Sequence, residues 1–449
     1  MGYSKATIEQ ERVSEMSQKN ILSADNLLKR VRAGFDQIKD HRALNRVISL
    51  SDALMSAFAM FSLKDSSLLE FDERRHKDGN LKQIYGLETI PSDSQMRTII
   101  DEVSSEEFRP IFKDGLSQLE RSKVLSKMVY YGKYYLLTLD GTTHFSSKKV
   151  NCAACLQRKN KQTGQITYAH QMMGGAIVHP DFKTVVPFMP EAIIKQDGEN
   201  KNDCERNAAQ RFLLKVRQDH PDLPLIITED GLSPNAPHIK ALKAGDFRFI
   251  LAVKEKDHTY LFDYVNKANQ TTVYEEREGK IIHRYRFLNR VPLNESNQEV
   301  LVNFLEYWEI DSTTGNIIQH FSWVTDFTLV KWNLGAIMRG GRARWKIENE
   351  TFNTLKNQGY HFEHNYGHGQ KNLSVNLAIL IMLAFFIDQI QQAACPLFQA
   401  VLKKEGSRKR LWEHTRALFY TLSFSSMAEI YRALLYGYTV EKVIIFGPK

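Results

Sequence analysis

Residues 134–143 (YYLLTLDGTT) constrain the fold most, because they join the pattern of a buried strand to a single acid. The leucines are apolar, the tyrosines and threonines favour strands, and Gly141 directly follows Asp140. We therefore expect a buried strand that ends at Asp140 and Gly141. A lone Asp-Gly pair would more often be a turn, so its meaning depends on the acids elsewhere in the chain.

Two further acids stand at comparable places. Residues 223–230 (LPLIITED) form a second apolar run that ends in Asp230, followed by Gly231. Glu348 lies on a predicted helix near Trp345. Two strand-end aspartates and one helical glutamate can together hold divalent metal ions, which is chemistry suited to phosphodiester bonds.

The spacing of the helix around Glu348 predicts which way this acid faces. Trp345, Glu348, Phe352 and Leu355 are 3, 4 and 3 residues apart, which places them on one stripe of an α-helix. Glu348 is then expected to face the core, where an unpaired carboxylate would cost several kcal/mol and so implies a cation. Glu350 is expected to face solvent. An ion pair with Arg344, four residues earlier, is the structural alternative.

The 449 residues are 43% hydrophobic and 25% charged, which is typical of a globular protein with more than one domain. We expect an α/β fold: a mixed sheet with flanking helices, interrupted by a β-rich insertion, with helical regions at both ends. The predicted parts are a helical region at 1–130, a first part of the α/β domain at 131–254, the insertion at 255–327, a last part of that domain with the Glu348 helix at 328–390, and a basic helical region at 391–449.

Local signals predict several helices within these parts. Helical spacing is present in residues 21–38 and 43–61, Ser92 should cap a helix with Met96, Ile99 and Ile100 on its apolar side, and residues 203–217 should form an amphipathic helix. The apolar stretch 373–387 contains Asn376 and meets Asp388, so we expect a buried helix and no membrane span.

The net charge of +8 lies entirely after residue 327, where 16 Lys and Arg face 8 Asp and Glu. A local basic field suits a polyanion such as DNA, although a merely solvated basic surface gives the same count. Four cysteines and an N-terminus without signal character lead us to expect a cytoplasmic protein. Neither a GxGxxG nor a Walker loop occurs, so no nucleotide cofactor is expected.

Cys152 and Cys155 have the CxxC spacing of zinc ligands, with Cys204 and His170 as candidate third and fourth ligands. The second pair is divided between a helix start and a strand, and buried free cysteines are common. We therefore expect these cysteines to pack in the interior and do not expect a structural zinc site.

Taken together, LTLDGT, ITEDG, WVTDF at 323–327 and RWKIENETFNTLK at 344–356 resemble the DDE transposases of the IS4-type insertion-sequence family. The resemblance covers roughly residues 130–390. Two positions depart from the family's helix signature, since Gly341 occupies its Tyr place and Leu355 its Lys place, with Lys356 one residue further on.

The resemblance implies a ribonuclease-H-like catalytic domain whose acidic triad is Asp140, Asp230 and Glu348, holding two Mg²⁺ or Mn²⁺ ions. It implies a DNA transposase that cleaves at the ends of its element and joins them to target DNA, acting as a homodimer in the DNA complex. In such a protein residues 131–254 and 328–390 would form the catalytic domain, and residues 1–130 are a possible DNA-end-binding domain. The resemblance also implies a protein of bacterial type, associated with the nucleoid when bound to DNA. Arg344 and Lys356 carry over as contacts to DNA, and Arg342 and Lys346 belong to the same basic stretch. The alternatives are a nuclease of this fold without strand joining and a catalytically inactive DNA-binding protein derived from a transposase.

Overall fold

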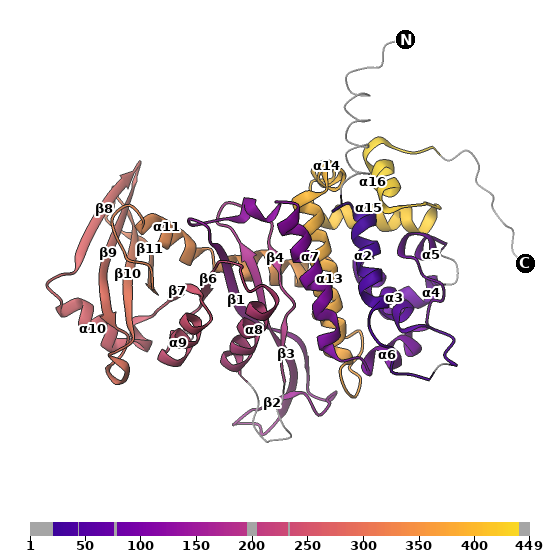
Figure 1. The fold of residues 1–449 in the computed structure, drawn as a ribbon, viewed down its shortest axis with the longest axis horizontal. Helices are drawn as coiled ribbons and strands as arrows, with labels where there is room; N and C mark the ends of the chain where they lie inside the picture. Colours follow the sequence, from indigo (N-terminus) through magenta and orange to yellow (C-terminus); the bar gives the residue numbers. More distant parts are fainter. Residues whose placement is uncertain (1–20, 44, 76–78, 195–203, 232–233, 440–449) are drawn as a thin grey trace, which may run out of the picture. The chain divides into compact units, whose positions relative to one another are not determined.

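The computed structural model describes residues 21–43, 45–75, 79–194, 204–231 and 234–439. The chain divides into two compact units, which Figure 1 shows in ribbon form. Residues 119–354 form a unit built on a β-sheet, here called the sheet unit, and residues 1–118 with 355–449 form a helical unit. The described N-terminal and C-terminal parts of the chain thus belong to one unit, and the sheet unit is formed by the middle of the sequence.

The sheet unit contains one mixed sheet. Its strands lie in the order β2-β3-β1-β6-β7-β11-β10-β9-β8, with β4 and β5 paired to β3. The strands are β1 (Tyr135–Ser147), β2 (Leu156–Lys159), β3 (Ile166–Val178), β4 (Val186–Pro187), β5 (Glu191–Ile193), β6 (Leu225–Glu229), β7 (Arg248–Ala252), β8 (Thr272–Glu278), β9 (Ile281–Pro292), β10 (Leu301–Asp311) and β11 (Ile317–Thr325).

The connections within this sheet combine two kinds of pairing. β3 runs antiparallel to β1, whereas β6 runs parallel to β1 and β7 parallel to β6. Each parallel step is made through a helix, α8 (Glu205–Asp219) before β6 and α9 (Ala236–Ala244) before β7. The predicted α/β class with a mixed sheet is therefore confirmed.

Helices cover both faces of the sheet. A Cβ added to Gly175 of β3 would lie 2.3 Å from the ring of Phe212 of α8, and one added to Gly174 would lie 2.8 Å from the ring of Phe352. Successive residues of a strand face opposite sides, so Phe212 and Phe352 mark the two faces. Phe352 ends a π-helical turn, η5 (Ile347–Phe352), which follows α11 (Leu334–Arg342) and packs on β1 and β3.

Two expectations about strands change in the structure. β1 does not end at Gly141 but runs to Ser147, because β3 continues to pair with it after β6 has ended. The β-rich segment 255–327 contributes β8, β9, β10 and β11, which extend the same sheet from β7. It also contains helix α10 (Thr259–Lys267) and the short turns η3 (Glu255–Asp257) and η4 (Glu295–Asn297).

The described part of the helical unit is built from helices of both chain ends. They are α2 (Ala24–Asp36), α3 (Leu50–Leu63), α4 (Leu68–Arg74), α5 (Gly79–Tyr85), α6 (Asp93–Asp101), η1 (Ser105–Phe108), α7 (Arg109–Arg121), α13 (Leu373–Ala394), α14 (Pro396–Glu405), α15 (Arg408–Thr421) and α16 (Met427–Tyr436). The turn η2 (Leu125–Met128) follows α7, and α12 (Asn353–Asn357) continues η5.

The capping signal at Ser92 is confirmed: its side chain accepts from Gln95 N–H, and the Gln95 side chain closes a capping box on α6. The second predicted helix is shorter than expected. It begins at Leu50, not near residue 43, because the Ser49 side chain caps it and Asp40 accepts from the Leu50 N–H at 3.1 Å. The start of the predicted helix at 203 lies outside the described residues.

α13 is the central helix of the helical unit. Among the described residues it is the one helix long and apolar enough to cross a membrane by length and composition, and its apolar stretch is buried within the fold. The two polar residues that interrupt its sequence pattern both have partners. The Asn376 amide donates to the carbonyls of Ile100 and Val103, and Asp388 lies 2.7 Å from the Lys64 ammonium. The predicted buried helix is confirmed.

The Lys64–Asp388 pair has both side chains almost fully buried. Burial lowers the pKa of Lys64 to about 8, although the Asp388 charge opposes this shift. The ammonium also lies 4.2 Å from the ring centroid of Tyr360 and 4.1 Å from that of Trp412. The buried Lys64 ammonium therefore depends on the Asp388 carboxylate for its counter-charge.

Asp388→Asn should lower the free energy of unfolding by about 3 kcal/mol at neutral pH, because it leaves the Lys64 ammonium without a counter-charge. The loss should shrink as the pH rises through about 8, the pKa of Lys64, because the neutral amine needs no carboxylate. Urea unfolding followed by tryptophan fluorescence measures this. Glu102→Gln, which removes an exposed partner of Lys371, is the control and should leave the midpoint unchanged. Equal effects of the two substitutions would contradict the prediction.

Candidate active site

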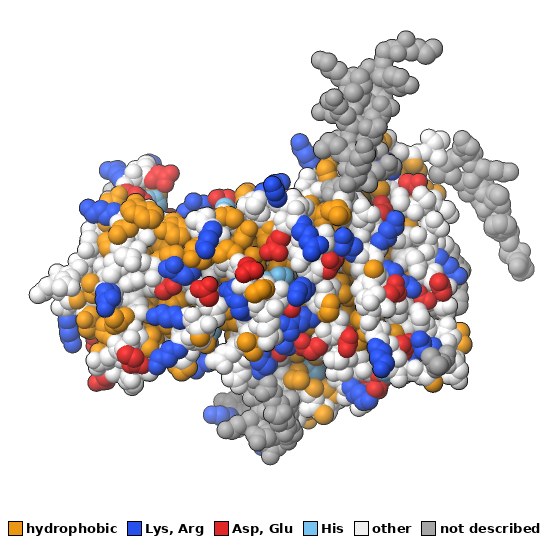
Figure 2. All heavy atoms as spheres, in the orientation of Figure 1, with side chains coloured by type: hydrophobic (Ala, Val, Ile, Leu, Met, Phe, Trp, Pro, Cys, Tyr) orange, Lys and Arg blue, Asp and Glu red, His pale blue; other side chains and the backbone are white. Residues whose placement is uncertain are grey.

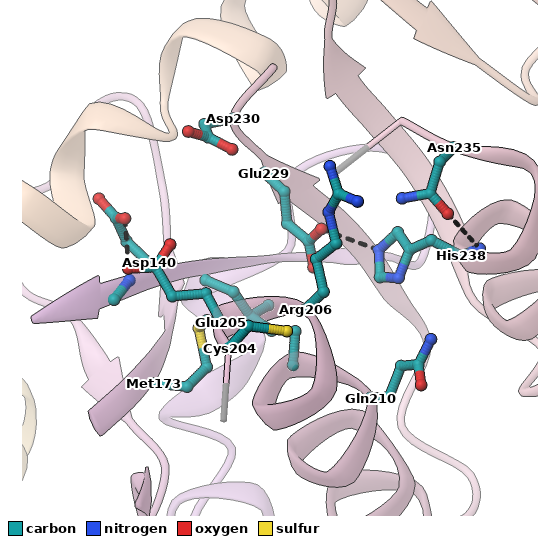
Figure 3. Close-up of a pocket in the computed structure, with 13 residues that line it drawn as sticks. Asp140, Met173, Cys204, Glu205, Arg206, Gln210, Glu229, Asp230, Asn235 and His238 are labelled. Atoms are coloured by element: carbon teal, nitrogen blue, oxygen red, sulfur yellow. Dashed lines mark hydrogen bonds and ion pairs between the residues drawn. The ribbon is translucent and has the colours of Figure 1, made fainter. Parts of the chain in front are cut away.

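The two predicted strand acids lie at the same level of neighbouring strands. The parallel ladder between β1 and β6 ends with the pair Thr138 and Thr228. Asp140 and Asp230 each follow two residues later, so the same register carried forward places them opposite one another. Both line one cavity of about 390 Å³, shown in Figure 3.

Asp140 faces the side of the sheet that η5 covers. It pairs with Gly174 in the ladder with β3, and directly paired residues share a face. Gly174 faces Phe352, so Asp140 does as well. Thr138, on the same face, donates its hydroxyl to the Arg344 carbonyl at 3.3 Å. The segment from Arg344 to Phe352 therefore lies on the face of the sheet to which Asp140 points.

A third carboxylate reaches this cavity from the other face. Glu205 is the first residue of α8, and a Cβ added to Gly141 would lie 2.3 Å from its Oε1 atom. Any residue larger than glycine at position 141 would displace Glu205. Burial, followed by the charge of Asp230, raises the pKa of Glu205.

The pKa of Asp140 is raised to about 6. Burial is the main cause, and the charges of Asp230 and Glu205 add to it. The Arg344 guanidinium, 3.5 Å from the Asp140 carboxylate, and the Gly141 N–H, at 2.9 Å, act in the opposite direction. The site thus gathers more negative charge than its arginine offsets.

A buried pair supports the strand end that carries Asp230. Glu229 faces away from Asp230's side and lies 2.8 Å from Nε2 of His238 on α9. Burial lowers the pKa of His238, but its interaction with Glu229 outweighs burial and leaves the pKa raised. Asn235 caps α9 by accepting from the His238 N–H at 3.1 Å, as Figure 3 shows.

Glu348 does not face the core as predicted. Its side chain is exposed, Trp345 is 51% exposed, and Glu350, predicted to face solvent, is half-buried. The helix is interrupted at residues 343–344 and continues through the π-helical turn η5, so the spacing of a regular α-helix does not apply. Phe352 and Leu355 of the predicted stripe are buried.

Glu348 nevertheless belongs to the segment that lies over Asp140. Arg344, four residues before it, pairs with Asp140, and Phe352, four residues after it, packs on Gly174 opposite Asp140. The predicted alternative, an ion pair between Arg344 and Glu348, is replaced by the pair between Arg344 and Asp140.

The four predicted DNA contacts all have partners in the structure. Arg344 pairs with Asp140, as described above. Arg342 lies 3.6 Å from Glu309, Lys346 donates to the Phe182 carbonyl at 2.7 Å, and Lys356 lies 2.8 Å from Glu363. Gly341, where the resembling family has Tyr, packs against the indole of Trp323, and an added Cβ would lie 2.3 Å from its Nε1. A tyrosine would not fit there.

The predicted thiol and imidazole ligands are divided. Cys152, Cys155 and His170 lie together, whereas Cys204 occupies the N-cap position of α8 without a capping hydrogen bond from its side chain and lines the cavity of Asp140. Glu205 and the Glu229–His238 pair were not predicted from the sequence. The one sequence signal for Glu205 is Gly141, because a glycine directly after Asp140 indicates that another group packs closely against the backbone there.

In comparisons with known proteins, no family model and no curated protein sequence matches this chain. The assignment of an activity therefore depends on the geometry above together with the sequence motifs.

The raised pKa of Asp140 predicts a pH-dependent effect of Asp140→Asn without divalent ions. As the pH rises from 4 to about 6, the free energy of unfolding of the wild type should fall, because Asp140 ionises more readily in the unfolded chain than in its half-buried place in the folded protein. The variant lacks this loss and should be more stable at pH 7.5 by about 1 to 2 kcal/mol, after allowance for solvent screening. Unfolding in EDTA at both pH values measures the difference, which should vanish at pH 4. A variant less stable than wild type at pH 7.5 would contradict this account.

Proposed function

We propose that this chain is a DNA transposase with an acidic triad of Asp140, Asp230 and Glu348. It rests on one observation: both aspartates line one cavity at the end of a parallel strand pair, beside the segment that contains Glu348. The order of β3, β1, β6 and β7, with β3 antiparallel and the others parallel, supports a ribonuclease-H-like catalytic domain.

The residues at this site fit divalent metal ions of the hard class. Carboxylate oxygens are the donors that Mg²⁺ and Mn²⁺ prefer. Burial is the main cause of the raised pKa of Asp140, and the negative charges of Asp230 and Glu205, which a cation would offset, add to it. Asp140 and Asp230 would hold the ions, with Glu348 as the third ligand. Two bound ions would lower the pKa of the attacking water or 3′-hydroxyl and stabilise the leaving oxygen.

Two side chains of the protein hold this site in place: one offsets charge at Asp140, and the other fixes the segment that contains Glu348. Arg344 holds the Asp140 carboxylate, and Phe352 fixes the η5 segment on β3. DNA phosphates would compete for Arg342, Arg344, Lys346 and Lys356 with the partners that these cations now have. On the face in Figure 2, Lys and Arg are interspersed with Asp and Glu, so support for DNA comes from the acidic site and its flanking arginines.

The proposal includes DNA ends and target DNA as partners, a homodimer in the DNA complex, and action in the cytoplasm. Strand joining needs two element ends, which favours two copies of the chain. The defining experiment incubates the full chain and Mg²⁺ with the DNA that flanks its own gene and maps the cut ends. Cut and joined products support a transposase, cutting without joining indicates a nuclease, and binding without either indicates an inactive DNA-binding protein.

Asp140→Asn and Asp230→Asn should each abolish cleavage, because each replaces a charged carboxylate ligand of the metal ions by a neutral amide. DNA affinity should stay nearly unchanged, because neither variant removes a Lys or Arg side chain that contacts DNA. Sequencing-gel detection of nicks and a gel-shift titration measure the two properties. Near-normal nicking by either variant would exclude that aspartate from the site.

The third ligand is tested by three matched variants. Glu348→Gln should be inactive, whereas Glu350→Gln, on the same turn, and Glu205→Gln, on the other face of the sheet, should each keep at least about a tenth of the activity. An inactive Glu205→Gln with an active Glu348→Gln would move the third ligand to α8. An inactive Glu350→Gln with an active Glu348→Gln would show that η5 presents the other acid.

Mg²⁺ or Mn²⁺ should raise the melting temperature of the wild type by an increment that grows with ion concentration, equivalent to about 2.7 kcal/mol at a hundred times Kd. The increment should be much smaller in Asp140→Asn, because this variant lacks a ligand. Glu275→Gln, on the exposed strand β8, is the control and should respond like the wild type. Equal responses of all three proteins would place the ion elsewhere.

A further inference from the structure

Two thiols and one imidazole of the sheet unit converge on one point outside the acidic site. Cys152 and Cys155 lie in the turn before β2, and His170 lies on β3. The Cys152 and Cys155 sulfur atoms are 3.8 Å apart. Nε2 of His170 is 3.4 Å from the first and 3.5 Å from the second.

These separations match the edges of a tetrahedral zinc site. With Zn–S bonds of about 2.3 Å and a Zn–N bond of about 2.0 to 2.1 Å, tetrahedral angles place two sulfurs about 3.8 Å apart and sulfur and nitrogen about 3.5 Å apart. A disulfide would instead need its sulfurs at about 2.05 Å. Simple packing would not require all three distances to agree with one coordination polyhedron.

The surroundings hold these groups in place. Cys155 is fully buried and His170 is 1% exposed. The turn is closed by the Cys155 N–H, which donates to the Cys152 carbonyl at 3.2 Å, and the Cys152 N–H donates to the Cys155 sulfur at 3.4 Å. The His170 ring lies beside those of His144 and Phe145, with centroids 5.8 and 5.9 Å away. A sulfur that accepts a backbone N–H and an oriented imidazole are features of ligand support.

We propose that Cys152, Cys155 and His170 bind a zinc ion. Two sulfurs and one imidazole supply three of the four ligands of a tetrahedral site, and the fourth is identified by the experiment below. The proposal does not depend on the transposase activity, because none of these residues lines the acidic cavity.

The ion would fix a segment that has little other support. β2 is a strand of four residues at the edge of the sheet, and three of its four side chains are exposed. Between Asp140 and Asp181 the sequence has no acidic residue and five cations: Lys148, Lys149, Arg158, Lys159 and Lys161. Zinc would join the CxxC turn before this basic hairpin to β3, where His170 pairs with Phe145 of β1.

The test uses the full chain purified without chelator and dialysed, with zinc counted by plasma mass spectrometry. We expect one zinc per chain in the wild type, and loss of the ion in both Cys152→Ser and Cys155→Ser. Cys204→Ser, which changes an exposed cysteine outside the cluster, is the matched control and should retain the ion. X-ray absorption of the wild type should show two sulfur ligands at about 2.3 Å, and it reads the fourth ligand directly.

Two measurements need only the wild type, so they remain decisive where a serine variant fails to fold. Replacement of zinc by Co²⁺ should give the strong near-ultraviolet absorption of sulfur-to-cobalt charge transfer. A wild type that binds no zinc or Co²⁺, or binds the ion through nitrogen and oxygen alone, would overturn the proposal. So would a Cys152–Cys155 disulfide found by mass spectrometry of the protein kept without reductant, or zinc retained in both serine variants.

Discussion

The half-buried carboxylate of Asp140 is the group around which the candidate active site of the sheet unit is arranged. It lies where the strand β6 has ended and β3 still pairs with β1, so one side of the strand is open. Asp230 and Glu205 add negative charge from two directions, and Arg344 is the cation that opposes them. The local structure is arranged to keep this charge in place, since glycine at 141 and 174 permits the close approach of Glu205 and Phe352.

The same sheet explains why residues far apart in sequence meet at this point. The parallel ladder places Asp230 level with Asp140, although 230 − 140 = 90 residues separate them. The η5 segment then crosses the face to which both point, held at one end by Arg344 and at the other by Phe352. A π-helical turn widens the helix and shifts the direction of its side chains, which brings Glu348 to the surface.

The sequence predicted those features that depend on local pattern. The strands before Asp140 and Asp230, the cap at Ser92 and the buried helix α13 all follow from periodicity and short-range hydrogen bonding. The direction of Glu348 could not be predicted, because a π-helical turn has no reliable sequence signal. Glu205 and the Lys64–Asp388 pair depend on contacts between distant segments, the latter across 324 residues, and such contacts follow from the fold.

The two sets of proposed ligands differ in chemistry and are linked through the ladder of β1 and β3, since Asp140 lies on β1 and His170 on β3. Carboxylates suit Mg²⁺ or Mn²⁺, whereas thiolates and imidazole suit zinc, so the two sets prefer different metal ions and would not compete for the same one. Asp140 pairs with Gly174 and Phe145 with His170 in the same ladder, which places the two sets 145 − 140 = 5 residues apart along β1. At about 3.3 Å per residue this is about 17 Å, too far for a shared ligand. An ion bound at His170 would therefore act on the acidic site through the register of the ladder, which shifts between Thr143 and Phe145, and only weakly through its charge.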